Sequence, residues 1–172
     1  MMKQIAYQEL SPEAFGTFGS YAAMIDPATV RIGAPPIEFY RDMVQADLGA
    51  AHTGSFGVCR VAERPYVINV SEYHNGCPEV VLPLDGDVLI HVAPAVPEKE
   101  FPFDSAAAFR VPRGTLVVLR PGVWHHGPFT IDTPVTNCLV MLPERTYMID
   151  CAFFDFPKSK WIRITGPGLS HP

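Results

Sequence analysis

The chain has 172 residues, of which 48% are hydrophobic and 18% are charged, and its formal net charge at pH 7 is -5. This length suits one domain with a real core, and the composition argues against disorder. A general nucleic-acid binder would need a basic face, and a membrane span would need about 20 consecutive apolar residues. The first residues lack the apolar segment of a secretory signal, so we expect a cytoplasmic protein without nucleic-acid or membrane partners.

Cysteine and proline add two further constraints. Cys59, Cys77, Cys138 and Cys151 show no C-x-x-C spacing, which predicts free thiols and gives no sign of a zinc knuckle. The 18 prolines are spread along the whole chain. Proline cannot donate to a strand ladder or continue a helix interior, so this content favours many short strands over long helices.

The first half of the chain begins with a short helix. Ser11 is a good N-cap and Pro12 suits the first turn, so we expect a helix that ends near Gly16. Residues 20–50 leave two interpretations open, because their apolar positions fit a helix and residues 39–44 also fit a strand. Strands are predicted at 66–74 and 79–84. Asp85-Gly86 predicts a hairpin turn with a return strand at 87–93.

The second half predicts more short strands separated by turns. We expect a loop at 92–102, one helical turn at 105–108 capped by Asp104, and strands at 109–111, 115–119, 135–142 and 149–154. At least six short strands with little helix favour a sandwich or barrel. We therefore predict a single domain over residues 1–172. Its core covers about residues 3–155, and residues 156–172 form a C-terminal tail in which Trp161 and Ile164 are possible docking points.

A group of histidines and carboxylates carries the candidate chemistry. Glu72 and His74 lie two apart on a predicted strand, so both project from one face. Glu79 opens the next strand and can return toward that face. Together with the later Gly122-Val123-Trp124-His125, this spacing resembles the two motifs of cupins, which are jelly-roll barrels around one divalent metal. The resemblance implies that Glu72, His74, Glu79 and His125 hold nickel, manganese, zinc or iron.

Three segments resemble the ureidoglycolate lyase family, formerly called ureidoglycolate hydrolase. They are Leu10–Gly19, which is similar to LSxEAFxxYG; Glu72–Asn75 followed by Glu79; and Val123–His126, which matches VWHH. This resemblance implies an all-β, cupin-type jelly-roll barrel with a few short helices. It also implies a homodimer that cleaves ureidoglycolate, or a similar small hydroxy or ureido acid, to glyoxylate and urea.

The family resemblance also implies roles for individual residues. His74, Glu79 and His125 would act as metal ligands or as the base that removes the hydroxyl proton, and Glu72 would complete the ligand set. Arg60 would hold the substrate carboxylate, because a guanidinium grips a carboxylate with two hydrogen bonds. Trp124 would serve as packing or as a pocket wall near the substrate.

Simpler interpretations stand beside these roles. His126 is expected on the opposite strand face as a hydrogen-bonded or surface residue, and His91 as a satisfied core histidine. Arg60 and Glu72 are also compatible with solvated surface charges. Two other functions remain open. One is a different metal-dependent cupin enzyme, such as a dioxygenase or isomerase, and the other is a non-catalytic cupin that binds a small ligand.

Overall fold

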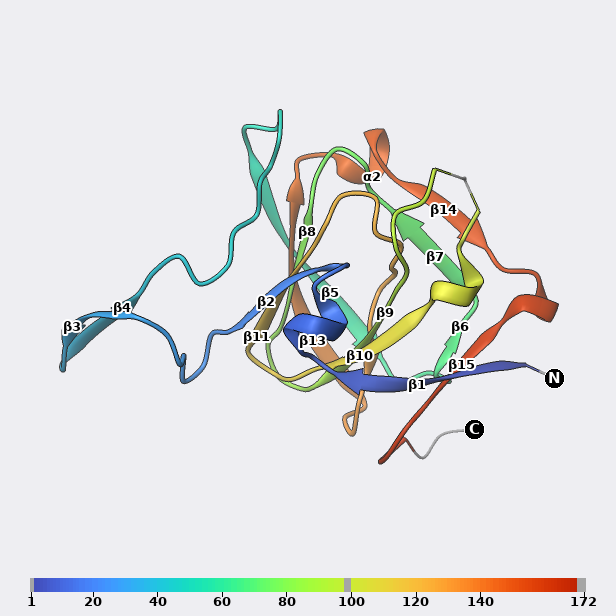
Figure 1. The fold of residues 1–172 in the computed structure, drawn as a ribbon, viewed down its shortest axis with the longest axis horizontal. Helices are drawn as coiled ribbons and strands as arrows, with labels where there is room; N and C mark the ends of the chain where they lie inside the picture. Colours follow the sequence, from blue (N-terminus) through green and yellow to red (C-terminus); the bar gives the residue numbers. More distant parts are fainter. Residues whose placement is uncertain (1, 98–99, 170–172) are drawn as a thin grey trace.

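The computed structural model describes residues 2–97 and 100–169 and consists mainly of two facing β-sheets (Figure 1). One sheet has the order β12 (Phe129–Thr130), β9 (Val88–Val92), β10 (Ala107–Val111), β1 (Lys3–Glu9), β15 (Ile162–Thr165) and β6 (Val67–Ile68). The other has the order β2 (Gly19–Ala23), β11 (Thr115–Leu119), β8 (Glu79–Pro83), β13 (Val135–Pro143) and β5 (Gly54–Ala62). The predicted all-β barrel fold is confirmed.

Smaller elements surround these sheets. Two further strand pairs are β7 (Val70–Tyr73) with β14 (Ala152–Asp155), and β3 (Arg31–Ala34) with β4 (Ile37–Tyr40). The helical turns are α1 (Pro12–Phe15), α2 (Thr146–Ile149), η1 (Phe103–Ser105) and η2 (Lys158–Lys160). The predicted N-cap is present, since the Ser11 hydroxyl accepts a hydrogen bond from the Ala14 N–H at 3.1 Å.

The chain alternates between the two sheets, as it does in a jelly roll. It leaves β8 for β9 and β10 in the other sheet, returns for β11, crosses again for β12, and returns for β13. The hairpin predicted at Asp85-Gly86 is therefore wrong, because β8 and β9 lie in different sheets. Asp85 accepts from the backbone N–H of Asn137 at 2.7 Å, and Asp87 accepts from that of Arg113 at 2.8 Å. These bonds hold the crossing to its neighbours.

The end of the chain belongs to the core. β15 lies between β1 and β6, parallel to β1 and antiparallel to β6. Ile162 and Ile164 are buried and flank the half-exposed Arg163, which is the period-two pattern of a strand. The segment 156–172, predicted as a tail outside the core, thus supplies a sheet strand. The docking role expected for Ile164 is confirmed.

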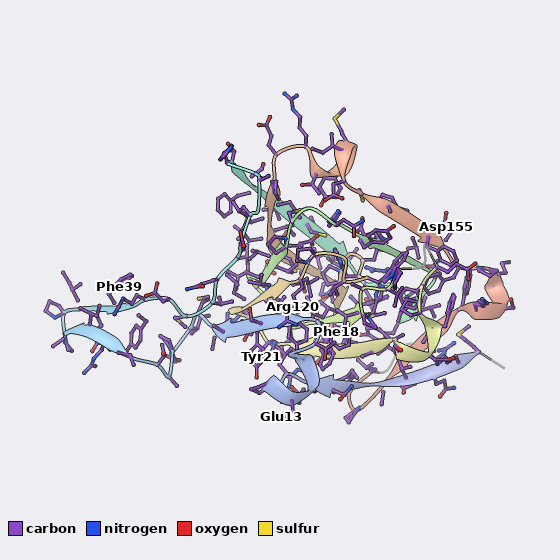
Figure 2. The ribbon with its side chains drawn as sticks, turned by 45° about the horizontal axis from the view of Figure 1, so that its top comes forward. Glu13, Phe18, Tyr21, Phe39, Arg120 and Asp155 are labelled. Carbon is purple, nitrogen blue, oxygen red and sulfur yellow. The ribbon has the colours of Figure 1, made fainter. Side chains whose placement is uncertain are left out.

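The ambiguous region 20–50 contains strands. β3 and β4 form a two-stranded arm that projects away from the barrel on the left of Figure 1, and Phe39 lies on this arm in Figure 2. The helical turn predicted at 105–108 is wrong. The turn is η1 at 103–105, and from Ala107 the chain is extended because it pairs with β1 and β9. At 149–154 the strand begins only at Ala152, after α2.

Two apolar clusters fill the molecule, one on each face of the six-stranded sheet. Ile90 of β9 packs in the cluster between the sheets, together with Phe15 and Phe109, whereas its neighbour Leu89 packs in the outer cluster. Trp124 and Ile162 belong to the outer cluster. β9 is therefore buried on both faces, which explains why all of its residues except His91 are apolar. In the described part of the chain, no helix is long and apolar enough to cross a membrane.

Candidate active site

Three of the predicted residues converge at one end of the five-stranded sheet. Glu79 is the first residue of β8, and His74 follows β7 directly. His125 is held beside β7 by an antiparallel bridge, in which its N–H donates to the Glu72 carbonyl at 2.8 Å and the Glu72 N–H donates back at 2.6 Å. As a result, the Glu79 Oε2 atom lies 3.0 Å from His125 Nε2 and 3.3 Å from His74 Nε2.

The other nitrogen of each imidazole is already bound. His74 Nδ1 lies 2.6 Å from the Asp150 carbonyl oxygen, and His125 Nδ1 lies 2.8 Å from the Val123 carbonyl oxygen. A carbonyl oxygen only accepts hydrogen bonds, so each Nδ1 carries a proton. In a neutral ring, Nε2 then presents its lone pair toward Glu79. Such carbonyl contacts are typical of histidines that bind metals.

The donor set fits a divalent cation. The ligand atoms of His74, Glu79 and His125 all lie within 4.8 Å of one another. His74 Nε2 is buried and makes no hydrogen bond within the described residues. Two imidazole nitrogens and one carboxylate, with further positions open, are a common donor set for zinc, nickel, manganese or iron.

The electrostatics of the cluster favour the ionised carboxylate. Burial would raise the pKa of Glu79, but the charge and hydrogen bond of His125 and the contact with His74 hold this pKa at about 2. Burial would lower the pKa of His125, but the Glu79 carboxylate raises it above the ordinary value. The ionised Glu79 carboxylate can therefore either form an ion pair with a protonated His125 or bind a metal ion.

Glu72 takes part in a second, overlapping group. Its Oε1 atom accepts from His126 Nδ1 at 2.9 Å, and its Oε2 atom accepts from the Cys151 thiol at 3.2 Å. The ligand atoms of Glu72, His74 and Cys151 lie within 4.8 Å of one another. The structure thus divides the four predicted ligands between two groups that share His74.

Sequence reasoning missed the roles of His126 and Cys151. His126 was expected on the opposite face as a hydrogen-bonded or surface residue. It is hydrogen-bonded, but it lines the same cavity as His125, because the chain there is held by single bridges. The His-His doublet was the available signal. No local pattern could have revealed Cys151, since 79 residues separate it from Glu72.

An open cavity of about 240 Å³ lies over the cluster. Polar groups at its wall come from Glu72, Glu79, His125, His126 and Tyr147, and the remainder of the wall is mostly apolar. Burial, followed by the charge of Glu79, raises the pKa of Tyr147 to about 12, so the phenol stays protonated and can donate a hydrogen bond. The cavity can therefore accommodate a small polar molecule beside the candidate metal ligands.

Arg60 and Trp124 do not line this cavity. Arg60 is exposed on β5, and its charge acts on Asp85, whose pKa is lowered first by the hydrogen bonds from Asn137 and also by Arg60. Trp124 is 2% exposed and packs against Tyr73 with a ring-centroid distance of 4.4 Å. It therefore has the packing role that was one of its two expected roles.

Comparisons with known proteins give a family. A family model described as ureidoglycolate lyase matches residues 2–163. A search of curated proteins found no match. Among solved structures, a dTDP sugar isomerase from Desulfovibrio desulfuricans G20 is 13% identical, with a TM-score of 0.49, over 81% of this chain and 84% of that chain. An oxalate decarboxylase from Bacillus subtilis is 16% identical, with a TM-score of 0.43, over 60% of this chain. The match spans 24% of the decarboxylase chain.

Proposed function

The chain belongs to the ureidoglycolate lyase family, and from this premise we propose that it cleaves ureidoglycolate, or a similar small hydroxy or ureido acid. The observation that carries the proposal is the buried group of His74, Glu79 and His125, of which Glu79 and His125 line an open cavity. It provides basic atoms, and a place for a cation, at the point where a small substrate can enter.

The proposed reaction moves one proton and breaks one bond. The carbinol hydroxyl of ureidoglycolate loses its proton, the oxygen forms the carbonyl of glyoxylate, and the carbon–nitrogen bond breaks. The departing nitrogen takes up a proton and leaves as urea, so no oxidant or reductant is needed. Glu79 or His125 accepts the hydroxyl proton, as a positioned carboxylate or imidazole can do.

We further propose that His74, Glu79 and His125 can hold a divalent cation, with nickel, manganese, zinc and iron as candidates. With a cation bound, His125 Nε2 would be a ligand, so the base would be the second carboxylate oxygen of Glu79. When bound, such a cation would lower the pKa of the substrate hydroxyl. The protein residues fix the geometry: the carbonyls of Asp150 and Val123 orient the two imidazoles. The mostly apolar wall limits the water around the substrate.

The direct test is release of glyoxylate and urea from ureidoglycolate by the purified protein, with and without added nickel or manganese. We expect enzyme-dependent release of both products in equal amounts. His125→Ala should reduce kcat by about 100-fold or more, the usual effect of losing a group that transfers a proton. His52→Ala is the matched control because His52 is exposed and lies outside the cavity. Absence of turnover under every metal condition would contradict the proposal.

A further inference from the structure

A second cavity adjoins the one above the cluster. The two share Cys59 and residues 126–128 as a common wall. The second cavity is further lined by residues 60–64 at the end of β5, residues 67–70, His91 and Phe129. Charged groups from both cavities act on the Cys59 thiol. Burial raises its pKa, the Glu79 carboxylate raises it further, and the Arg64 guanidinium lowers it. Arg64 and Glu79 are thus both close to this shared wall.

Arg64 is a half-buried cation without a carboxylate partner among the described residues. Its Nη2 atom donates to the Gly127 carbonyl at 2.8 Å, and its guanidinium carbon lies 4.1 Å from the centre of the Phe129 ring. Across residues 2–97 and 100–169, no acidic side chain forms an ion pair with Arg64. Burial lowers its pKa. The ring and the carbonyl hold the guanidinium in place and leave other N–H groups for an anion.

His91 provides a second, independent sign of a ligand in this cavity. The Ser71 hydroxyl donates to the His125 carbonyl at 3.0 Å, so its oxygen accepts from His91 Nε2 at 3.1 Å. His91 Nδ1 is then a bare acceptor, and it is buried without a partner among the described residues. His91 itself is 1% exposed and lines the cavity. A buried polar atom without a partner is rare, and here it calls for an N–H or O–H donor.

We propose that the second cavity is the carboxylate subsite of the enzyme, in which Arg64 grips the carboxylate of a small hydroxy or ureido acid. This inference rests on the proposed function, since it assigns the anionic end of the same substrate. A ureido N–H of the same ligand donates to His91 Nδ1, and the ligand hydroxyl is left for Glu79 and His125. The role expected for Arg60 passes to Arg64, because Arg64 is the more buried of the two and is held in place by Gly127 and Phe129.

The test is calorimetric titration of glycolate, a small hydroxy acid, into the metal-free and the metal-loaded protein. We expect binding to both forms, with an affinity at least ten-fold weaker for Arg64→Ala. Arg64→Lys, which keeps the charge but loses the two-bond grip, should fall between them. Glycolamide, the neutral analogue, should bind the wild type no more tightly than it binds Arg64→Ala. Arg41→Ala is the matched control, because Arg41 is exposed and pairs with Asp42.

Circular dichroism and a melting curve establish that each variant is folded. The subsite is overturned if folded Arg64→Lys and Arg64→Ala bind glycolate as tightly as the wild type does. It is also overturned if Arg60→Ala weakens glycolate binding and Arg64→Ala does not. The two proposals fail separately. Arg64-dependent glycolate binding without ureidoglycolate turnover would sink the lyase proposal alone. Turnover with a KM unchanged by Arg64→Ala would sink the subsite alone.

Discussion

The Nε2 atom of His125 lies 3.0 Å from Oε2 of Glu79, although 46 residues separate them in the chain. His125 is held in place by its backbone bridge to Glu72. Glu79 is held in place by the pairing of β8 with β11 and β13. The contact therefore depends on the relative position of two sheet regions. The distance between Glu79 and His125 should therefore be kept only while the barrel is folded.

Exchange of each carboxylate for its amide distinguishes the two overlapping groups. Glu79→Gln should weaken binding of a divalent metal by about 10- to 100-fold, because Glu79 faces both imidazoles. Glu72→Gln should weaken it less, since the Glu72 carboxylate is occupied by His126 and Cys151. Competition with a chelator measures both affinities. Equal losses would instead place Glu72 in the same centre as Glu79.

Acid stability should depend on His91. Burial lowers the pKa of His91 well below 6.5, so the folded protein keeps this imidazole neutral. In the unfolded chain, His91 binds a proton below its ordinary pKa of about 6.5. The contribution of His91 to the free energy of unfolding is therefore constant above that pH and falls as the pH drops below it. The expected slope is about 1.4 kcal/mol of unfolding free energy per pH unit.

Urea unfolding at several pH values, compared between wild type and His91→Gln, isolates this contribution. We expect the variant to be less stable than the wild type near neutral pH. On acidification it should lose less stability, because its unfolding is coupled to the uptake of one proton fewer. Ile149→Ala should follow the wild-type slope, because it removes no titratable group and Ile149 is 78% exposed. Parallel pH curves for wild type and His91→Gln would show that His91 is protonated in the folded state.

The contribution of the last strand can be measured with one substitution. Ile162 is 0% exposed in β15, so Ile162→Ala should cost about 2–5 kcal/mol of unfolding free energy. Ile149→Ala, at a position that is 78% exposed, should change stability by about 0.5 kcal/mol or less. Chemical unfolding measures both. Similar small effects for the two variants would mean that β15 is dispensable.

The arm made of residues 30–40 is where we expect the homodimer contact that the family resemblance implies. Its exposed apolar side chains are Val30, Ile32, Ile37 and Phe39. An isolated two-stranded hairpin is marginally stable in water, and a second copy of the chain would cover this apolar surface. Phe39→Asp should convert a dimer to a monomer in light scattering, whereas Val58→Asp on β5 should not. A monomeric wild type, or a dimeric Phe39→Asp variant, would exclude this contact.

Local patterns predicted what depends on local chemistry. The cap at Ser11, the strand at 115–119 and the approach of Glu79 to His74 follow from side-chain type and spacing. The hairpin at Asp85-Gly86 failed because a turn dipeptide fixes the bend but not the sheet that receives the next strand.

Residues that meet through the fold stayed hidden. Arg60 and Arg64 lie four positions apart near the end of β5, and only the packing of Phe129 and Gly127 shows which one is held at the cavity. Likewise, β15 is short and lies among polar residues. Its place in the sheet depends on the gap between β1 and β6, which the order of elements along the chain does not reveal.

The position of β15 between β1 and β6 has a consequence for synthesis on the ribosome. Among the described strands, β1 is made first and gains one neighbour when β10 appears, but its other neighbour, at residues 162–165, is made last. The six-stranded sheet therefore cannot be completed until residues 162–165 have left the ribosome. Until then, the Lys3–Ala6 edge of β1 is open to other chains, so termination of synthesis before β15 should yield aggregates.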